Sequence, residues 1–245
     1  MKGIGTILNV STVLLGSIIG VFLKGGIPER LEKTIMSAVS LAVIIIGLSG
    51  TLSEMFTVSE KGVVSANNIL LLIISLVIGG IIGELLDIED KIEKIGVFFK
   101  RKVKFLSKNN PKFVDGFVSS SLIFCVGAMA VVGSISDGLT GNYTTLAAKS
   151  VLDGTTSLVL SASFGSGVIL SSLTVGVYQG AITLMAGLLK PIMTEVIVSQ
   201  MSMVGSVLIL GIGINMLFEK KYVKTGNLLP AIFIPVIYNL ILNIF

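Results

Sequence analysis

The sequence predicts an all-α protein, a polytopic bundle of about eight transmembrane helices (seven are possible), and three observations support this. Of its 245 residues, 53% are hydrophobic and only 13% are charged, about half the charged fraction of a typical soluble domain. The mean hydropathy is +0.98. Seven stretches contain no Asp, Glu, Lys or Arg, and six of them are 20 to 23 residues long, close to the ~20 residues with which a helix crosses a bilayer. This composition excludes a disordered chain and argues against a soluble enzyme.

The uncharged stretches must be helical, because lipid offers the backbone no hydrogen-bond partners. One of them, Gly154–Leu189, has 36 residues and is too long for one span. We divide it at Phe164–Gly167, where glycine and serine replace the apolar residues. The expected helices are then 4–23, 35–53, 67–86, 114–134, 145–164, 167–189, 198–218 and 228–244.

Basic residues support this arrangement of helices. The connections around residues 24–33, 91–112 and 220–224 hold three, eight and three of them, together 14 of the 18 in the chain. These are alternate connections, which the positive-inside rule places in the cytoplasm. Both termini are therefore expected outside.

We expect a single integral membrane domain, 1–245, in which a connector, 87–112, joins the helices of 1–86 to those of 113–245. The connector mixes apolar residues with acidic residues first and basic residues later. It is typical of a helix lying on the cytoplasmic leaflet, with Lys100–Lys104 near anionic lipid. A solvated connector explains the composition equally well. No nucleic-acid partner is expected, because the basic stretch lacks interleaved aromatic residues suited to base stacking.

Some segments resemble one another, which favours internal repeats of helical hairpins. Leu15–Gly20 is similar to Ile78–Gly83, and Gly50–Glu54 is similar to Gly133–Asp137. Three pairs of glycines also have the G-x-x-x-G spacing that lets helices approach closely. They predict helix packing in a compact bundle and a homo-oligomer, and they are Gly16 and Gly20, Gly79 and Gly83, and Gly176 and Gly180.

Catalysis is not expected. The chain has no histidine and one cysteine, Cys125, so histidine-based nucleophile pairs, proton relays and metal sites are excluded. Known catalytic motifs are missing as well. We therefore expect neither an enzyme nor a bound metal or cofactor.

Polar residues gather in the otherwise apolar region between Asp137 and Gln179. Lys149 and Asp153 are four residues apart, so on a helix they share a face and can pair. An ionisable residue inside a span is costly, which indicates a functional site. The alternative is a pair near the outer interface, where Lys149 snorkels to the surface. Asn9 is expected only to hydrogen-bond between helices.

The break between the fifth and sixth helices adds a second candidate feature. At membrane depth, a break of this kind would present backbone groups to an ion or solute, as in transporters. The alternative is an ordinary turn at the cytoplasmic surface. The full set of candidate binding residues is Asp153, Lys149, Ser157, Ser161, Gly165, Ser166, Gly167, Gln179 and Asp137.

We interpret the chain as a membrane transporter or ion-conducting protein for a small solute or ion, whose identity the sequence does not reveal. Asp153 would bind a cation or proton, and Lys149 would hold Asp153 or a substrate carboxylate. The alternative is a non-transporting scaffold or sensor that acts through the basic connector.

Several segments resemble a known family over the whole chain. They are Gly3–Asn9 with Gly16 and Gly20, Phe124–Met129, Gly133–Ser134 with Asp137–Gly138, and Lys149–Asp153 followed by Gly165–Val168. The chain is similar to the YqgA/YdfK-like family of bacterial multi-pass membrane proteins, a domain-of-unknown-function family. The resemblance implies the bacterial cytoplasmic (inner) membrane and a transport role. It brings no substrate or catalytic residue, but it suggests that Lys149–Val168 is a hallmark of the family.

Overall fold

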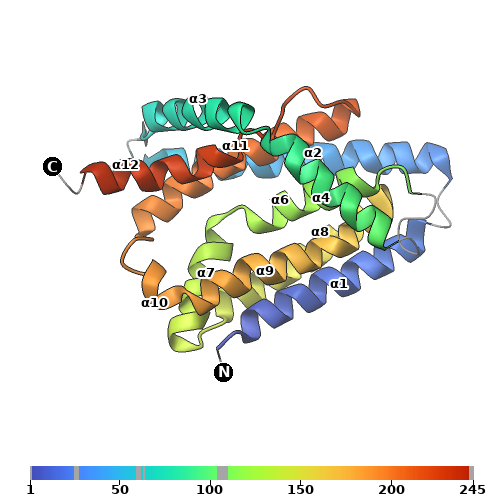
Figure 1. The fold of residues 1–245 in the computed structure, drawn as a ribbon, viewed down its shortest axis with the longest axis horizontal. Helices are drawn as coiled ribbons and strands as arrows, with labels where there is room; N and C mark the ends of the chain where they lie inside the picture. Colours follow the sequence, from blue (N-terminus) through green and yellow to red (C-terminus); the bar gives the residue numbers. More distant parts are fainter. Residues whose placement is uncertain (1, 25–27, 59–61, 63, 104–109, 243–245) are drawn as a thin grey trace. The chain divides into compact units, whose positions relative to one another are not determined.

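The computed structural model describes residues 2–24, 28–58, 62, 64–103 and 110–242, which are almost entirely helical (Figure 1). The elements are α1 (Ile4–Lys24), α2 (Glu29–Met55), β1 (Phe56–Val58), β2 (Val64–Ala66), α3 (Ile69–Leu85), α4 (Ile88–Lys102), α6 (Phe113–Cys125), α7 (Ala128–Thr140), α8 (Thr144–Phe164), the 3₁₀ helix η1 (Gly165–Leu170), α9 (Ser171–Leu184), α10 (Ala186–Leu189), α11 (Glu195–Phe218), the 3₁₀ helix η2 (Leu229–Phe233) and α12 (Ile234–Leu242).

The chain folds into two compact units, and each contains segments that are distant in the sequence. The first unit consists of Met1–Val39, Ile92–Cys125 and Met129–Pro191, and the second of Ser40–Lys91, Val126–Ala128 and Ile192–Phe245. The first therefore holds α1 and the helices from α6 to α10, apart from the start of α7. The single membrane domain expected over 1–245 stays a prediction.

The all-α transmembrane fold class is confirmed. Among the described residues, four helical stretches are long and apolar enough to cross a membrane, and six are if each bent pair, α3 with α4 and α6 with α7, is one span. One of the four, Thr144–Leu184, contains both α8 and α9. The prediction of about eight transmembrane helices counts these two separately and includes the shorter apolar stretch Leu229–Leu242.

In the first unit, α1 and α8 lie side by side and run in the same direction. A Cβ atom on Gly16 would collide with the carbonyl oxygen of Gly154, and one on Gly20 would collide with that of Leu158. Only glycine allows the two backbones to come this close. The spacing of the glycines thus positions the two helices against each other over several turns.

The helix α9 runs back along α1 in the opposite direction. Thr6 hydrogen-bonds Thr183 through their hydroxyl groups at 3.4 Å, and a Cβ atom on Gly176 would lie 3.2 Å from Cγ2 of Val10. The chain therefore reverses between α8 and α9, through η1. This reversal begins at Gly165, whose φ of +78° is a conformation that favours glycine. The division that the sequence indicates at Phe164–Gly167 agrees with this reversal.

The expected helix 114–134 is wrong, because the structure has two helices there. Helix α6 ends at Cys125, α7 begins at Ala128, and their axes are bent by 62°. Between them, Gly127 has a φ of +126°, which no α-helix contains. The glycine thus breaks the span near its middle.

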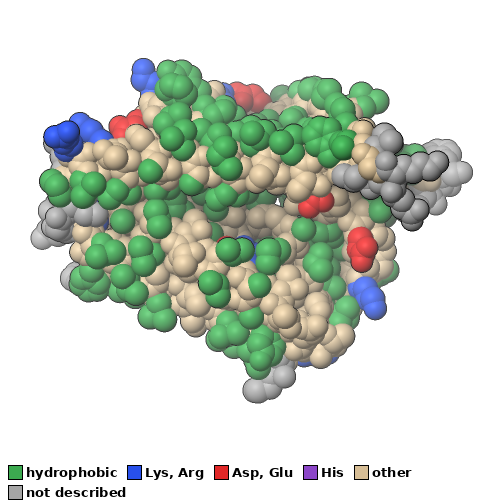
Figure 2. Space-filling model, turned by 180° about the vertical axis from the view of Figure 1, so that it is seen from behind, with side chains coloured by type: hydrophobic (Ala, Val, Ile, Leu, Met, Phe, Trp, Pro, Cys, Tyr) green, Lys and Arg blue, Asp and Glu red, His purple; other side chains and the backbone are tan. Residues whose placement is uncertain are grey.

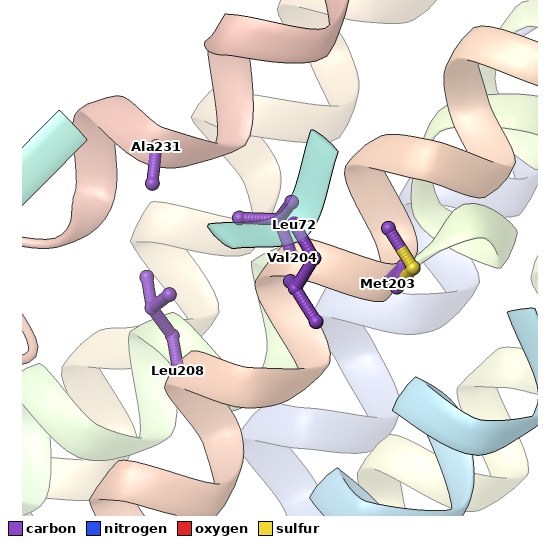
Figure 3. Close-up of a cluster of buried hydrophobic side chains, with 5 residues drawn as sticks. All are labelled: Leu72, Met203, Val204, Leu208 and Ala231. Atoms are coloured by element: carbon purple, nitrogen blue, oxygen red, sulfur yellow. The ribbon is translucent and has the colours of Figure 1, made fainter. Parts of the chain in front are cut away.

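The second unit has a small hydrophobic core between α3, α11 and η2. Leu72, Met203, Val204, Leu208 and Ala231 are all buried and gather in one cluster (Figure 3). The glycines of α3 contact a different kind of partner from those of α1. A Cβ atom on Gly79 or Gly83 would collide with the backbone in or next to η2, so similar motifs serve different contacts in the two units.

Several other boundaries differ from the sequence prediction. Helix α2 begins at Glu29 and α11 at Glu195, both earlier than expected. The last helix is described as far as Leu242, and its expected end at 244 lies outside the described residues. A two-stranded antiparallel hairpin follows α2, with Phe56 opposite Ala66 and Thr57 opposite Ser65. The hairpin is not predicted from the sequence, because its strands have only three residues each. Within the connector, α4 is described and 104–109 lies outside the described residues.

Many large apolar side chains face outward. Leu184 is 88% exposed, Phe22 80% and Leu85 79%, and hydrophobic and uncharged side chains cover most of the face shown in Figure 2. In water, exposed apolar area on this scale would cause aggregation. Lipid is the solvent that these helix faces require.

Because α1 and α8 are in such close contact, adding one methyl group at Gly16 should destabilise the fold. We expect Gly16→Ala to lower the free energy of unfolding by about 1–3 kcal/mol, because the new Cβ collides with the Gly154 backbone. Gly187→Ala is the control, since a Cβ atom at this position of α10 would meet no other atom within 4 Å. Thermal unfolding of the detergent-purified proteins measures both. Equal melting temperatures for the two variants would contradict the packing described.

Candidate functional site

The candidate site is a buried ion pair in the first unit. The ammonium group of Lys149 lies 2.9 Å from Oδ1 and 2.8 Å from Oδ2 of Asp153. From α1, Nδ2 of Asn9 donates a hydrogen bond of 2.9 Å to the same Oδ2. Lys149 is 6% exposed, Asp153 is 7% exposed and Asn9 is fully buried. The carboxylate is thus held from two helices, by a cation and by an amide.

The ion pair lies well inside α8 and not at its ends. Asp153 is nine residues after the first residue of α8 and eleven before the last. At about 1.5 Å per residue these separations correspond to about 14 Å and 16 Å. Lys149 reaches along its own helix to Asp153 and does not extend to a surface. The geometry therefore differs from that of a snorkelling lysine.

Two further polar groups lie close to the pair. The thiol of Cys125, at the end of α6, interacts electrostatically with both Lys149 and Asp153. The hydroxyl of Tyr178, on α9, interacts in the same way with Cys125. The sequence analysis selected neither residue. Their proximity depends on the break after α6 and on the reversal at η1, which bring them to the level of the pair.

The first unit also contains buried polar atoms that have no hydrogen-bond partner among the described residues. Both Oε1 and Nε2 of Gln179 are in this state, although the side chain is fully buried. Gln179 follows Gly176 and precedes Thr183 on α9, so it lies at the level of Asn9 along α1. The other such atoms in this unit are Asn9 Oδ1, Asn110 Oδ1, Ser134 Oγ, Ser161 Oγ and Ser163 Oγ.

Asp137 lies apart from the pair, at the beginning of α1. Its Oδ1 accepts a hydrogen bond of 3.1 Å from the backbone N–H of Gly3, and its Oδ2 accepts one of 3.0 Å from that of Gly5. A carboxylate in this position satisfies free amides and interacts favourably with the helix dipole. The structure therefore gives Asp137 a capping contact.

The Phe164–Gly167 break lies at the opposite end of α1. Nδ2 of Asn110 donates to the carbonyl oxygen of Phe164 at 3.0 Å and to Oγ of Ser166 at 3.3 Å. Lys24, the last residue of α1, donates to the carbonyl oxygen of Ser163 at 2.9 Å. Gly165 is twelve residues after Asp153, or about 18 Å along a helix. The structure thus separates the break from the ion pair.

The serines between these two features face α1. Oγ of Ser157 donates to the carbonyl oxygen of Gly154 at 2.8 Å, and a Cβ atom on Gly16 would touch this hydroxyl. Ser161 lies one turn further along α8, against Gly20. Both side chains are fully buried. They continue the polar face of α8 from the ion pair toward Ser163 and Ser166.

The arrangement presents charged and hydrogen-bonding groups in a buried position. Across the part of the chain that the structure describes, no three residues among His, Cys, Asp and Glu lie close enough together to hold a metal ion. What the site offers is one carboxylate, one ammonium group and two buried amides. These groups can exchange their partners without any covalent step.

Comparison with known proteins assigns the chain to a family. Residues 4–240 match the family described as "Protein of unknown function (DUF554)". The chain belongs to the DUF554 family. It is 31% identical over 241 residues to the "Uncharacterized membrane protein YdfK" of Bacillus subtilis (strain 168), which covers 98% of this chain and 97% of that protein. Membership of this family and the apolar helices make the chain a membrane protein.

A second relative is more distant. The "Uncharacterized protein YqgA" of Escherichia coli (strain K12) is 27% identical over 231 residues, covering 94% of this DUF554 chain and 93% of that protein. No solved structure matches the chain. The resemblance stated from the sequence is therefore confirmed at the level of the family.

The geometry of the pair predicts a non-additive effect on stability. Lys149→Met leaves the Asp153 carboxylate buried without its cation, so we expect a loss of about 3–5 kcal/mol in the free energy of unfolding. The double variant Lys149→Met/Asp153→Leu removes both charges and should recover most of this loss. Chemical or thermal unfolding of four proteins, namely the unaltered protein, Lys149→Met, Asp153→Leu and the double variant, measures the coupling. Strictly additive losses would contradict the described ion pair.

Proposed function

We propose that the protein is a transporter or ion-conducting protein for a small solute or ion, and that the Lys149–Asp153–Asn9 cluster is its binding point. The observation that carries the proposal is the buried ion pair at the middle of a helix in a membrane protein. Ionisable residues at such positions are costly and mark ion and substrate pathways. Transport without catalysis is the proposed activity.

The unpartnered polar atoms support this proposal. A buried polar atom without a partner costs about 1–3 kcal/mol. Several such atoms lie in the described part of the first unit, among them Ser161 Oγ and both polar atoms of the Gln179 side chain. Asn9 combines both properties, because its Nδ2 binds Asp153 while its Oδ1 has no partner among the described residues. A buried polar atom that hydrogen-bonds a passing solute would be without a partner when the solute is absent.

The opposite charges of Lys149 and Asp153 determine which of the two residues a charged ligand would bind. A monovalent cation or a proton would compete with the Lys149 ammonium group for the Asp153 carboxylate. A solute carboxylate would instead compete with Asp153 for Lys149. In either case the displaced group needs a new partner, and the buried amides of Asn9 and Gln179 offer both donors and acceptors.

We propose the bacterial cytoplasmic membrane as the location, with the basic connections inside and both termini outside. Alternation of the basic residues along the chain supports this orientation.

We also propose a homo-oligomer. A Cβ atom added at Gly180 on α9 would meet no other described atom within 4 Å, and Val177, on the same helix, is 65% exposed. This leaves part of the G-x-x-x-G motif free to contact a second copy.

A ligand screen tests the proposed binding point. Thermal unfolding of the purified protein is measured against a panel of monovalent ions, amino acids and small carboxylates. A ligand at 100 times its dissociation constant stabilises the folded state by about 2.7 kcal/mol. We expect at least one compound to raise the melting temperature, and we expect Asp153→Asn to remove that increase.

Glu84→Gln is the matched control, because it also converts a carboxylate to an amide but does so at an exposed side chain of the second unit. It should keep the full ligand-induced increase. If Asp153→Asn keeps the increase as well, the site lies elsewhere. If no compound stabilises the protein, a scaffold or sensor role becomes the better account.

A further inference from the structure

Helix α4 has one side packed against the first unit. Gly96 is buried, and a Cβ atom there would lie 2.8 Å from Cγ1 of Val114 on α6. The ring of Phe99 is 5.8 Å from that of Phe117, also on α6. These contacts fix the orientation of the helix from Ile92 onward. They also determine which of its side chains point away from the protein.

The opposite side of α4 combines apolar and basic residues. Ile95 is 51% exposed and Phe98 is 54% exposed. Lys102, one turn after Phe98, places its ammonium group 5.7 Å from the centre of the phenyl ring, and Arg101 beside it is also exposed. In the last two turns, from Val97 to Lys102, every charged residue is basic. An exposed aromatic ring among cations is unfavourable in water but matches the edge of a bilayer.

We propose that this face, formed by Ile95, Phe98, Arg101 and Lys102, is a binding surface for anionic phospholipid. Phe98 and Ile95 insert at the boundary between headgroups and acyl chains, and the two cations bind the phosphate of the headgroup. Anionic lipid attracts basic residues at a membrane surface, whereas zwitterionic lipid does not. The proposal is independent of the transport site, because it uses other residues and a different ligand.

The chain contains no tryptophan, so Phe98→Trp introduces a single fluorescent reporter on this face. An indole ring also preserves the cation–π contact with Lys102. The full-length variant is reconstituted into vesicles of phosphatidylglycerol and phosphatidylcholine in equal amounts, with only one of the two lipids brominated. We expect brominated phosphatidylglycerol to quench the tryptophan more strongly than brominated phosphatidylcholine.

The cations are then tested in the Phe98→Trp background. Arg101→Ala/Lys102→Ala should lower the preference for phosphatidylglycerol by about fivefold for each charge removed. The control is Lys2→Ala/Lys190→Ala, which removes two exposed basic residues at the other end of the first unit. It should leave the preference unchanged.

Three results would overturn the proposal. The first is a tryptophan that neither brominated lipid quenches, since this face would then point into water or contact protein. The second is equal quenching by both lipids in the starting variant, which would make the surface a general apolar contact. The third is an equal loss of preference in the control, which would attribute the effect to net charge.

Discussion

The close contact between α1 and α8 is the interaction on which the first unit depends. Gly16 and Gly20 allow the two backbones to approach until the α1 glycines touch carbonyl oxygens of α8. At that separation Asn9 reaches Asp153. Without it, the carboxylate would have only the lysine of its own helix. The glycines thus determine both the packing of the unit and the second partner of the buried carboxylate.

The buried polar cluster of Lys149, Asp153 and Asn9 depends on this contact, and its burial costs free energy. Taking two charges out of water costs several kcal/mol per ion even after relaxation, and a close pair recovers this only with additional hydrogen bonds. Asn9 supplies one such bond, yet its own Oδ1 and the whole amide of Gln179 have no partner in the described part of the chain. Apolar residues of similar size would pack more cheaply. The proposed binding of a polar species would explain why the cluster is not apolar.

Sequence and structure agree where local spacing determines the contact. The four-residue separation of Lys149 and Asp153 predicts their pairing, and the glycine spacing in α1 predicts a close helix contact. For Asn9 the sequence predicts a hydrogen bond between helices, and the structure has one. Its partner could not be predicted, because Asp153 lies 144 residues away in the sequence. The break at Gly127 was also missed, since its positive φ depends on the surrounding helices. The Phe164–Gly167 break was identified correctly in the sequence, but its position at the end of α1 depends on tertiary contacts with Lys24 and Asn110.

A transport role requires the Lys149–Asp153 pair to lie on a route open to water-soluble species. Cys125 is the only cysteine, it is partly exposed and it lies within electrostatic reach of the pair. The most direct measurement is its modification by a small, charged, membrane-impermeant thiol reagent in vesicles that contain the unaltered protein, followed by mass spectrometry. The account predicts modification of the folded protein, slowed by any ligand that raises the melting temperature. A thiol that reacts only after denaturation, even when the pH is raised to favour the reactive thiolate, would contradict it.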